Sequence, residues 1–181
     1  MNKVLTLSSI AALLMSPLAL AETSDESEQP DRVEIEWQNP KKFSDVRAAS
    51  GSNKKYRENT FKQLEKYLEK LATKLPEGQQ LKITVTDLDL AGKVWPGHFV
   101  GVDTTSDVRM IKRIDFPSMD FSYQLLNAEG QVLQEGTEEI KDMSFQDRAN
   151  RHFKNDSLRY EKNMLNDWFR KTLLKPQAEE E

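Results

Sequence analysis

Residues 54–90 read KKYRENTFKQLEKYLEKLATKLPEGQQLKITVTDLDL and contain the two most regular hydrophobic patterns of the chain. In the first part, apolar residues recur at intervals of three and four, which is the period of one helix face. The pattern predicts a helix from about Lys54 to Leu75 that ends at Pro76-Glu77-Gly78. The predicted apolar face consists of Phe61, Leu64, Leu68, Leu71, Ala72 and Leu75.

The opposite side of this helix carries a lysine stripe, Lys62, Lys66, Lys70 and Lys74, in which each lysine follows the last by four positions. Like charges at this spacing repel weakly, and Glu58, Glu65 and Glu69 partly offset them. Two interpretations remain open. The stripe is either the solvated face of the helix or a surface that holds phosphate-bearing lipid headgroups.

The second part of the stretch predicts a strand, because Leu81, Ile83 and Val85 alternate with polar residues. The phase then breaks: continued alternation would bury Asp87 and Asp89 and expose the leucines beside them. A β-bulge near Asp87 would shift the register by one residue and restore the buried leucines. A continuous ladder would instead bury two carboxylates together, one of which should then bind a proton or a cation.

Weaker patterns on both sides predict the remaining elements. Period-two alternation predicts strands, and the spacing of apolar residues predicts a last helix that begins near Asp156 or Ser157. On this helix Leu158, Glu161, Leu165, Trp168 and Thr172 share one face. The predicted strands are residues 33–37, residues 108–116, and a hairpin of residues 119–125 and 132–140, with a loop over residues 93–107 and a short helix over residues 144–153.

The order strand, helix, four strands, helix predicts an α+β fold. We expect a two-layer domain with a mainly antiparallel sheet of about four to five strands and two main helices packed on one face. The domain spans residues 32–175. A disordered acidic leader, residues 22–31, precedes it, and a disordered acidic tail, residues 176–181, follows it.

The first 21 residues have the features of a secretory signal peptide. Lys3 precedes an apolar run, and Ala19-Leu20-Ala21 places small residues where signal peptidase requires them. The sequence therefore predicts cleavage after Ala21, a periplasmic location, and a mature protein that is not transmembrane. The alternative is a retained membrane anchor, but the apolar run is short and an acidic stretch follows it.

Composition excludes several kinds of protein. The 181 residues include no cysteine, which excludes a disulfide scaffold, a thiolate metal site, a cysteine nucleophile and a lipid-anchored N-terminal cysteine. Residues 32–175 hold 25 basic and 22 acidic side chains, so this region is only mildly basic. That balance does not indicate nucleic-acid binding. Charged residues make up 31% of the chain, which excludes a polytopic membrane protein.

Nothing in the sequence points to a nucleophilic active site. There is no G-x-S-x-G, and the spacing ties no serine to either histidine, His98 or His152. The best catalytic alternative is a metal-dependent hydrolase centred on Asp87, Asp89 and His98, a carboxylate–imidazole set that suits a divalent ion. The segment from Asp87 fails the calcium-loop pattern, because the positions that supply most ligands hold alanine and histidine. We therefore expect no cofactor.

The loop from Trp95 to Phe99 places two aromatic side chains beside Pro96, Gly97 and His98. Such side chains offer flat apolar faces with polar edges, which suits a sugar ring or the apolar patch of a partner. The alternative is that Trp95 folds back over the edge of the sheet. The candidate binding residues are Asp87, Asp89, Trp95, His98 and Phe99.

A basic segment, residues 148–162, contains Arg148, Arg151, Lys154, Arg159 and Lys162. It is either a solvated helix face or a surface for anionic lipid, lipopolysaccharide or an acidic protein.

Several runs of sequence resemble a family of short exported proteins of Gram-negative bacteria, the domain of unknown function 3016. These runs are VEIEWQNPKKFSDVR, LATKLPEGQQLKITVTDLDLAG, DVRMIKRIDFPSMDFSYQLLNAEG and YEKNMLNDWF, which together extend over most of the chain. Within them, the motifs FSD (43–45), DLDLAG (87–92) and DWF (167–169) occur in the order of the family. The resemblance implies a periplasmic location and brings no activity, cofactor or catalytic residue.

The sequence thus favours a periplasmic, non-catalytic binding or accessory module of the cell envelope. The expected partner is an envelope protein or an anionic lipid headgroup. The alternatives are the metal-dependent hydrolase and an anionic lipid or lipopolysaccharide binder.

Overall fold

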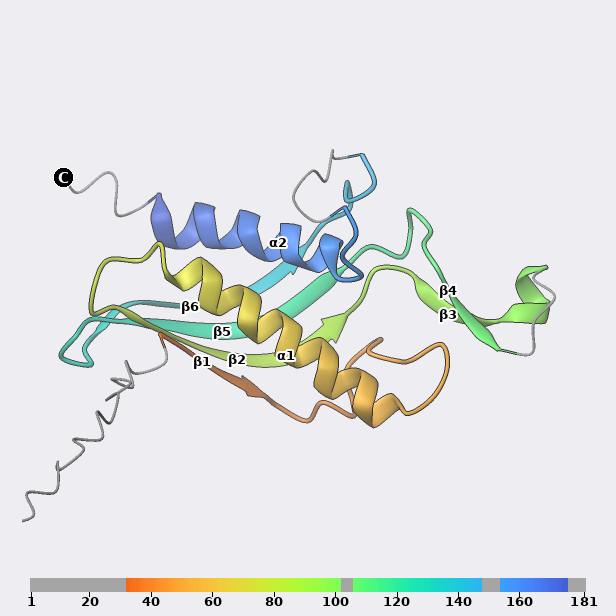
Figure 1. Ribbon diagram of the computed structural model, residues 1–181. Coiled ribbons are helices and arrows are strands. Elements are labelled where there is room, and N and C mark those ends of the chain that lie inside the picture. The colour runs from red at the N-terminus through yellow and green to blue at the C-terminus, as the bar shows by residue number, and fades with distance from the viewer. Residues whose placement is uncertain (1–31, 102–105, 148–153, 176–181) are drawn as a thin grey trace, which may run out of the picture.

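A computed structural model of the protein describes residues 32–101, 106–147 and 154–175 (Figure 1). The described residues form six strands, two α-helices, one 3₁₀ helix and one π-helical turn. In chain order these elements are β1 (Val33–Trp37), α1 (Asn53–Ala72), β2 (Gln80–Asp89), β3 (Lys93–Pro96), η1 (Gly97–Val100), β4 (Asp107–Met110), β5 (Ser118–Leu126), β6 (Val132–Lys141), α2 (Arg159–Phe169) and η2 (Arg170–Leu174).

The α+β fold is confirmed, but the sheet is mixed. Its strand order is β1-β2-β5-β6, with β1 parallel to β2 and the other two neighbouring pairs antiparallel. The parallel pair follows from the β1-α1-β2 connection, in which the helix crosses over the sheet and returns the chain in the same direction. The prediction of a mainly antiparallel sheet is therefore correct only in part.

Helix α1 agrees closely with its predicted range. The Ser52 hydroxyl accepts a hydrogen bond from the Lys55 N–H at 3.4 Å and caps the first turn. The predicted apolar face is buried, including Leu75, which follows the last helical residue. All four residues of the lysine stripe are exposed.

Both α-helices lie on the same face of the four-stranded sheet, α1 over β1 and β2 and α2 over β6 (Figure 1). Aromatic side chains join the two layers. The ring of Trp37 on β1 stacks on Phe61 of α1 with 4.1 Å between centroids. On the other helix, Trp168 packs edge to face against Phe121 of β5 at 4.8 Å. The predicted face of the last helix is thus buried in a single core.

The bulge in β2 is confirmed. The pairing of β2 with β5 shifts between Val85 and Asp87, which leaves Thr86 outside the regular register. Beyond the shift Leu88 is completely buried, in phase with Val85 on the helix-covered face. The bulge therefore brings the leucines into the core and turns Asp87 and Asp89 to the other side of the strand.

A second, two-stranded sheet extends away from the body of the molecule (Figure 1). It pairs β3 with β4 in antiparallel register, from Lys93 opposite Met110 to Pro96 opposite Asp107. We call it the ribbon, defined as residues 93–101 and 106–110. The predicted strand over residues 108–116 was wrong in extent, because only its first residues are extended, and these pair with β3. The predicted loop over residues 93–107 likewise contains a strand and the 3₁₀ helix η1.

The hairpin β5-β6 is confirmed, with the Asn127 amide side chain organising its turn through hydrogen bonds from Glu129 N–H and Gln131 N–H. Residues 144–147 form turns, so the described part of the predicted short helix is not helical. None of the described helices combines the length and the apolar character that a membrane crossing needs. The predicted signal peptide, acidic leader and acidic tail lie outside the described residues.

Candidate functional site

The far end of the ribbon presents a stacked aromatic pair. Trp95 on β3 and Phe99 on η1 lie nearly parallel, with 5.6 Å between ring centroids and an interplanar angle of 8°. The Phe99 side chain is 71% exposed, one of the most exposed large apolar residues among those described. This pair forms an apolar surface at a distance from the hydrophobic core, where packing cannot account for it.

A cation also contacts the tryptophan of this pair. The Lys112 ammonium lies 4.8 Å from the centroid of the Trp95 ring, within the range of a cation–π contact. The indole N–H of Trp95 is buried, and no atom among the described residues accepts a hydrogen bond from it. Trp95 therefore lies on the ribbon in contact with Phe99 and Lys112, and it does not fold back over the edge of the main sheet.

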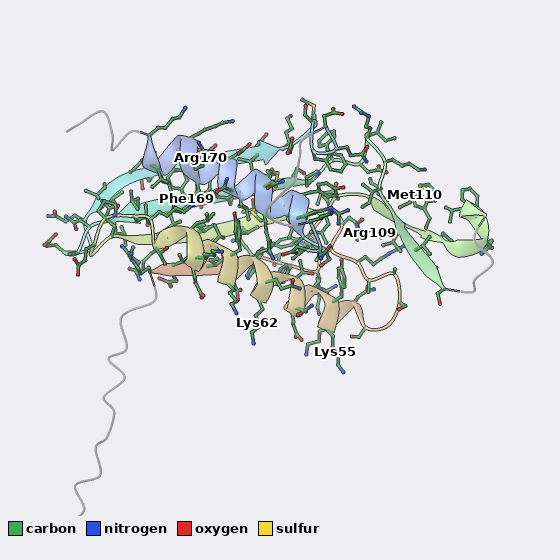
Figure 2. The ribbon with its side chains drawn as sticks, turned by 45° about the horizontal axis from the view of Figure 1, so that its top comes forward. Lys55, Lys62, Arg109, Met110, Phe169 and Arg170 are labelled. Carbon is green, nitrogen blue, oxygen red and sulfur yellow. The ribbon has the colours of Figure 1, made fainter. Side chains whose placement is uncertain are left out.

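Arg109 on β4 attaches the ribbon to the body, where Figure 2 shows it at the junction between the two. Its guanidinium donates to the carbonyl oxygen of Gly92 at 2.8 Å and to that of Arg47 at 2.9 Å. It also forms an ion pair with Asp45 at 3.1 Å, and both side chains are more than 80% buried. A planar, five-donor group can serve these acceptors at once.

Gly92 makes this junction possible. Its φ of +78° lies in the left-handed region, and an added Cβ would stand 2.5 Å from the carbonyl oxygen of Met110. Glycine thus allows β2 to turn into β3 while the backbone of β4 passes closely.

Asp87 holds the loop that follows β1. Its carboxylate accepts hydrogen bonds from the Ser44 N–H at 2.7 Å and from the Ser44 hydroxyl at 2.5 Å. The Asp87 carboxylate therefore fixes a neighbouring loop through a backbone N–H and a hydroxyl group.

Asp89 is different, because it is half-buried and forms no ion pair among the described residues. Burial raises the pKa of Asp89 to about 6, while Lys93 acts in the opposite direction and Asp45 and Asp87 reinforce the rise. Its Oδ1 atom is buried and has no hydrogen-bond partner among the described residues. Asp89 therefore titrates close to neutral pH.

Glu161 on α2 is a fully buried carboxyl group that reaches the same junction. Its Oε1 atom accepts a hydrogen bond from the Ala91 N–H at 2.8 Å, and burial raises its pKa. Its Oε2 atom has no partner within the part of the chain that the structure describes. The helix layer is thus joined to the residue that precedes the ribbon.

The five predicted site residues divide into two groups. Asp87 and Asp89 lie at the end of β2, while Trp95, His98 and Phe99 lie on the ribbon (Figure 1). Across residues 32–101, 106–147 and 154–175, no group of three or more His, Asp or Glu side chains is arranged to hold a metal ion. The set Asp87, Asp89 and His98 is not brought together as such a cluster.

Sequence patterns alone missed three of the residues that organise the junction. Glu161 carried a signal, because a carboxylate stands among apolar residues on one helix face. Asp45 lies in a motif that sequence analysis noted for another reason, and Arg109 stands in a short strand without a distinguishing pattern. Of the basic segment, residues 148–153 lie outside the described residues, and Lys162 is buried in an ion pair with Asp156 at 2.5 Å.

A family model described as a protein of unknown function, DUF3016, matches residues 31–171. The match spans most of the chain, and the chain belongs to this family. No match is found among the curated proteins or among the solved structures.

Proposed function

We propose that this member of the DUF3016 family is an exported, non-catalytic binding module of the cell envelope, and that the end of its ribbon contacts a protein partner. The stacked pair of Trp95 and Phe99 is the observation that carries the proposal. A large aromatic ring that is 71% exposed on a projecting element has no role in the core of the protein.

The ribbon has the physical properties of a binding element. Tryptophan and other large aromatic residues dominate the energy of protein interfaces, because they bury much area at little conformational cost. Here the Trp95 ring is already held between Phe99 and Lys112, so little further freedom is lost on binding. We infer that the partner presents an apolar or aromatic side chain to the exposed face of Phe99.

Export is the second part of the proposal. It is supported by the signal-peptide pattern of residues 1–21, whose small residues precede Glu22. Cell fractionation with N-terminal sequencing tests it: we expect the protein in the periplasmic fraction with Glu22 as its first residue. An unprocessed chain in the cytoplasm would contradict this part.

Site-specific photocrosslinking in cells tests the contact. A photoreactive amino acid replaces Phe99, which is exposed, instead of the more enclosed Trp95. The matched control places the same probe at Leu133, which is 52% exposed at the start of β6 in the main sheet. We expect a discrete protein adduct from position 99 and none of the same mass from position 133. Identical adduct patterns, or no adduct from a folded and exported protein, would refute the proposed contact.

A further inference from the structure

A hollow of about 350 Å³ lies beside the base of the ribbon. Three segments line it: the loop that follows β1, the first turn of α1, and β3. Four of the residues that line it are cationic, namely Lys41, Arg47, Arg57 and Lys93. Because these cations come from segments distant in the sequence, the fold itself gathers them around one space.

The positive charge of this hollow is poorly compensated. Its only carboxylate among the described lining residues is Asp45, whose charge is already engaged by Arg109. Within the described ranges, Lys41 and Arg57 form no ion pair, and Lys93 acts on Asp89 without a direct contact. Arg47 donates to the Val94 carbonyl oxygen and only approaches a carboxylate at 4.0 Å.

The start of α1 adds to this imbalance. The N-terminus of a helix carries a partial positive charge, and most helices place acidic residues there. The first turn of α1 has no acidic residue and holds Lys54 and Lys55, and Arg57 follows directly after it. Among the described residues, Lys54 alone of these three has a counter-ion, Glu58 at 3.7 Å on the exposed side. Figure 2 shows Lys55 and Lys62 directed away from the body, so these lysines belong to the outer face of the helix.

This arrangement of charges favours the binding of an anion. Cations that line one hollow repel one another. A bound anion would reverse the effect, because each cation would then gain a counter-charge. The lining also includes apolar side chains, Phe43 and Val94 among them, so the hollow can accept an organic group beside the charged one.

We propose that this hollow binds a phosphate group, either as a free phosphate ion or as the phosphate of a lipid headgroup. Phosphate fits better than a carboxylate, because it offers three or four oxygens to donors that come from three segments of the chain. The site is separate from the aromatic end of the ribbon, so it does not depend on the partner proposed above.

Titration calorimetry with the purified protein and inorganic phosphate tests the site. The variants are Arg57→Gln and Lys41→Gln, each of which removes one cation from the hollow. The matched control is Lys66→Gln, which removes the same charge from the outer face of the same helix. A parallel arm measures sedimentation with phosphatidylcholine vesicles that contain phosphatidic acid, and with vesicles of phosphatidylcholine alone.

We expect phosphate to bind the protein and the Lys66→Gln control equally, and to bind Arg57→Gln about tenfold more weakly. The affinity should also fall as the salt concentration rises. Binding of phosphatidic acid vesicles that is lost in Arg57→Gln, without binding of free phosphate, would identify the lipid headgroup as the source.

No binding in either arm would overturn the proposal. Equal weakening by Arg57→Gln and Lys66→Gln would also overturn it, because the interaction would then reflect net charge alone. Thermal melting without phosphate checks that Arg57→Gln folds. We expect its Tm to equal or exceed that of the parent protein, since the substitution removes a cation from the helix N-terminus.

Discussion

At the scale of single residues, Asp89 at the end of β2 has a carboxyl group whose ionised form lowers the stability of the fold. Burial raises the pKa of Asp89 to about 6, above its ordinary value. This direction determines how the stability of the protein depends on pH. A carboxyl group with a raised pKa in the folded state binds its proton more tightly there than in the unfolded chain. Its contribution to stability is therefore greatest below the unfolded pKa and declines as the pH rises towards about 6.

The substitution Asp89→Asn tests this sign. The amide cannot ionise, so the variant should melt at a higher temperature than the parent protein at pH 7.5, and the difference should shrink towards zero near pH 4. Calorimetric melting curves across this range measure the effect. Glu129→Gln is the control, because Glu129 lies in the exposed turn between β5 and β6 and should show no such trend. A difference that grows at low pH would contradict the assignment.

Glu161 supports a second prediction at this scale. The Ala91 N–H donates to its Oε1 atom at 2.8 Å in a buried environment. Glu161→Gln keeps an acceptor oxygen and removes the ionisable group, so it should leave the stability at pH 7.5 equal or higher. Glu161→Ala removes the acceptor and leaves both a cavity and an unpaired N–H, which should cost about 3 kcal/mol. Chemical denaturation at pH 7.5 compares the two variants, and similar losses in both would refute the role of the hydrogen bond.

The two residues also show what local sequence can reveal. A charged residue that interrupts an apolar pattern is visible in the sequence, as Glu161 does in the last helix and Asp89 does at the end of its strand. What each carboxyl group contacts is not visible, because Glu161 and Ala91 are 70 residues apart. Local patterns therefore identified the unusual positions and could not identify their partners.

At the scale of elements, the ribbon depends on Arg109 for its attachment. Lysine at this position would retain the charge but could not reach the carbonyl oxygens of Gly92 and Arg47 together with Asp45. Arg109→Lys should therefore destabilise the protein by about 2 kcal/mol and increase hydrogen exchange in β3 and β4.

The control for this prediction is Arg113→Lys. Arg113 pairs with Asp147 at 2.6 Å, but both side chains are at least half exposed. An exposed ion pair contributes little, so this variant should change the stability by less than about 0.5 kcal/mol. Equal effects of the two substitutions would show that the position of Arg109 has no special role.

The elements differ in how well the sequence predicted them, and the reason is physical. Helix α1, the hairpin β5-β6 and the bulge in β2 follow from long hydrophobic periods, since each buries one face in the core. Strands β3 and β4 have four residues each and bury no face in that core, so they carry no periodic pattern. Their pairing comes from the Arg109 contacts and the turn at Gly92, which sequence periodicity does not encode.

At the scale of the whole molecule, the candidate surfaces depend on contacts between distant segments. The junction combines Asp45, Asp89, Arg109 and Glu161, and the cationic hollow combines the loop after β1 with α1 and β3. The sequence predicted the α+β class and the order of the longer elements, because these follow from successive patterns, but it missed strand β3. It could not predict which loops meet beside the parallel pair β1 and β2, because that depends on the crossover of α1.

The separation of ribbon and core leads to a prediction for the molecule as a whole. No residue of the ribbon belongs to the hydrophobic core, which extends from Val33 to Leu173 through both helices and the main sheet. A chain in which Asn-Gly replaces residues 95–108 keeps Val94 and Arg109 as neighbours, and these two already face each other in the register of β3 and β4. The variant should retain the attachment by Arg109 and melt within a few degrees of the parent protein.

This variant separates the two proposals in one experiment. It removes the aromatic pair and should lose the proposed protein contact, but it retains Lys41, Arg57 and Lys93 and should still bind phosphate. Competition measures the first effect: excess variant added to a crosslinking lysate should not reduce the adduct formed from position 99, whereas excess parent protein should. Loss of cooperative melting would mean that the ribbon is part of the folding unit, because truncation is tolerated only where the removed backbone is not needed by the core.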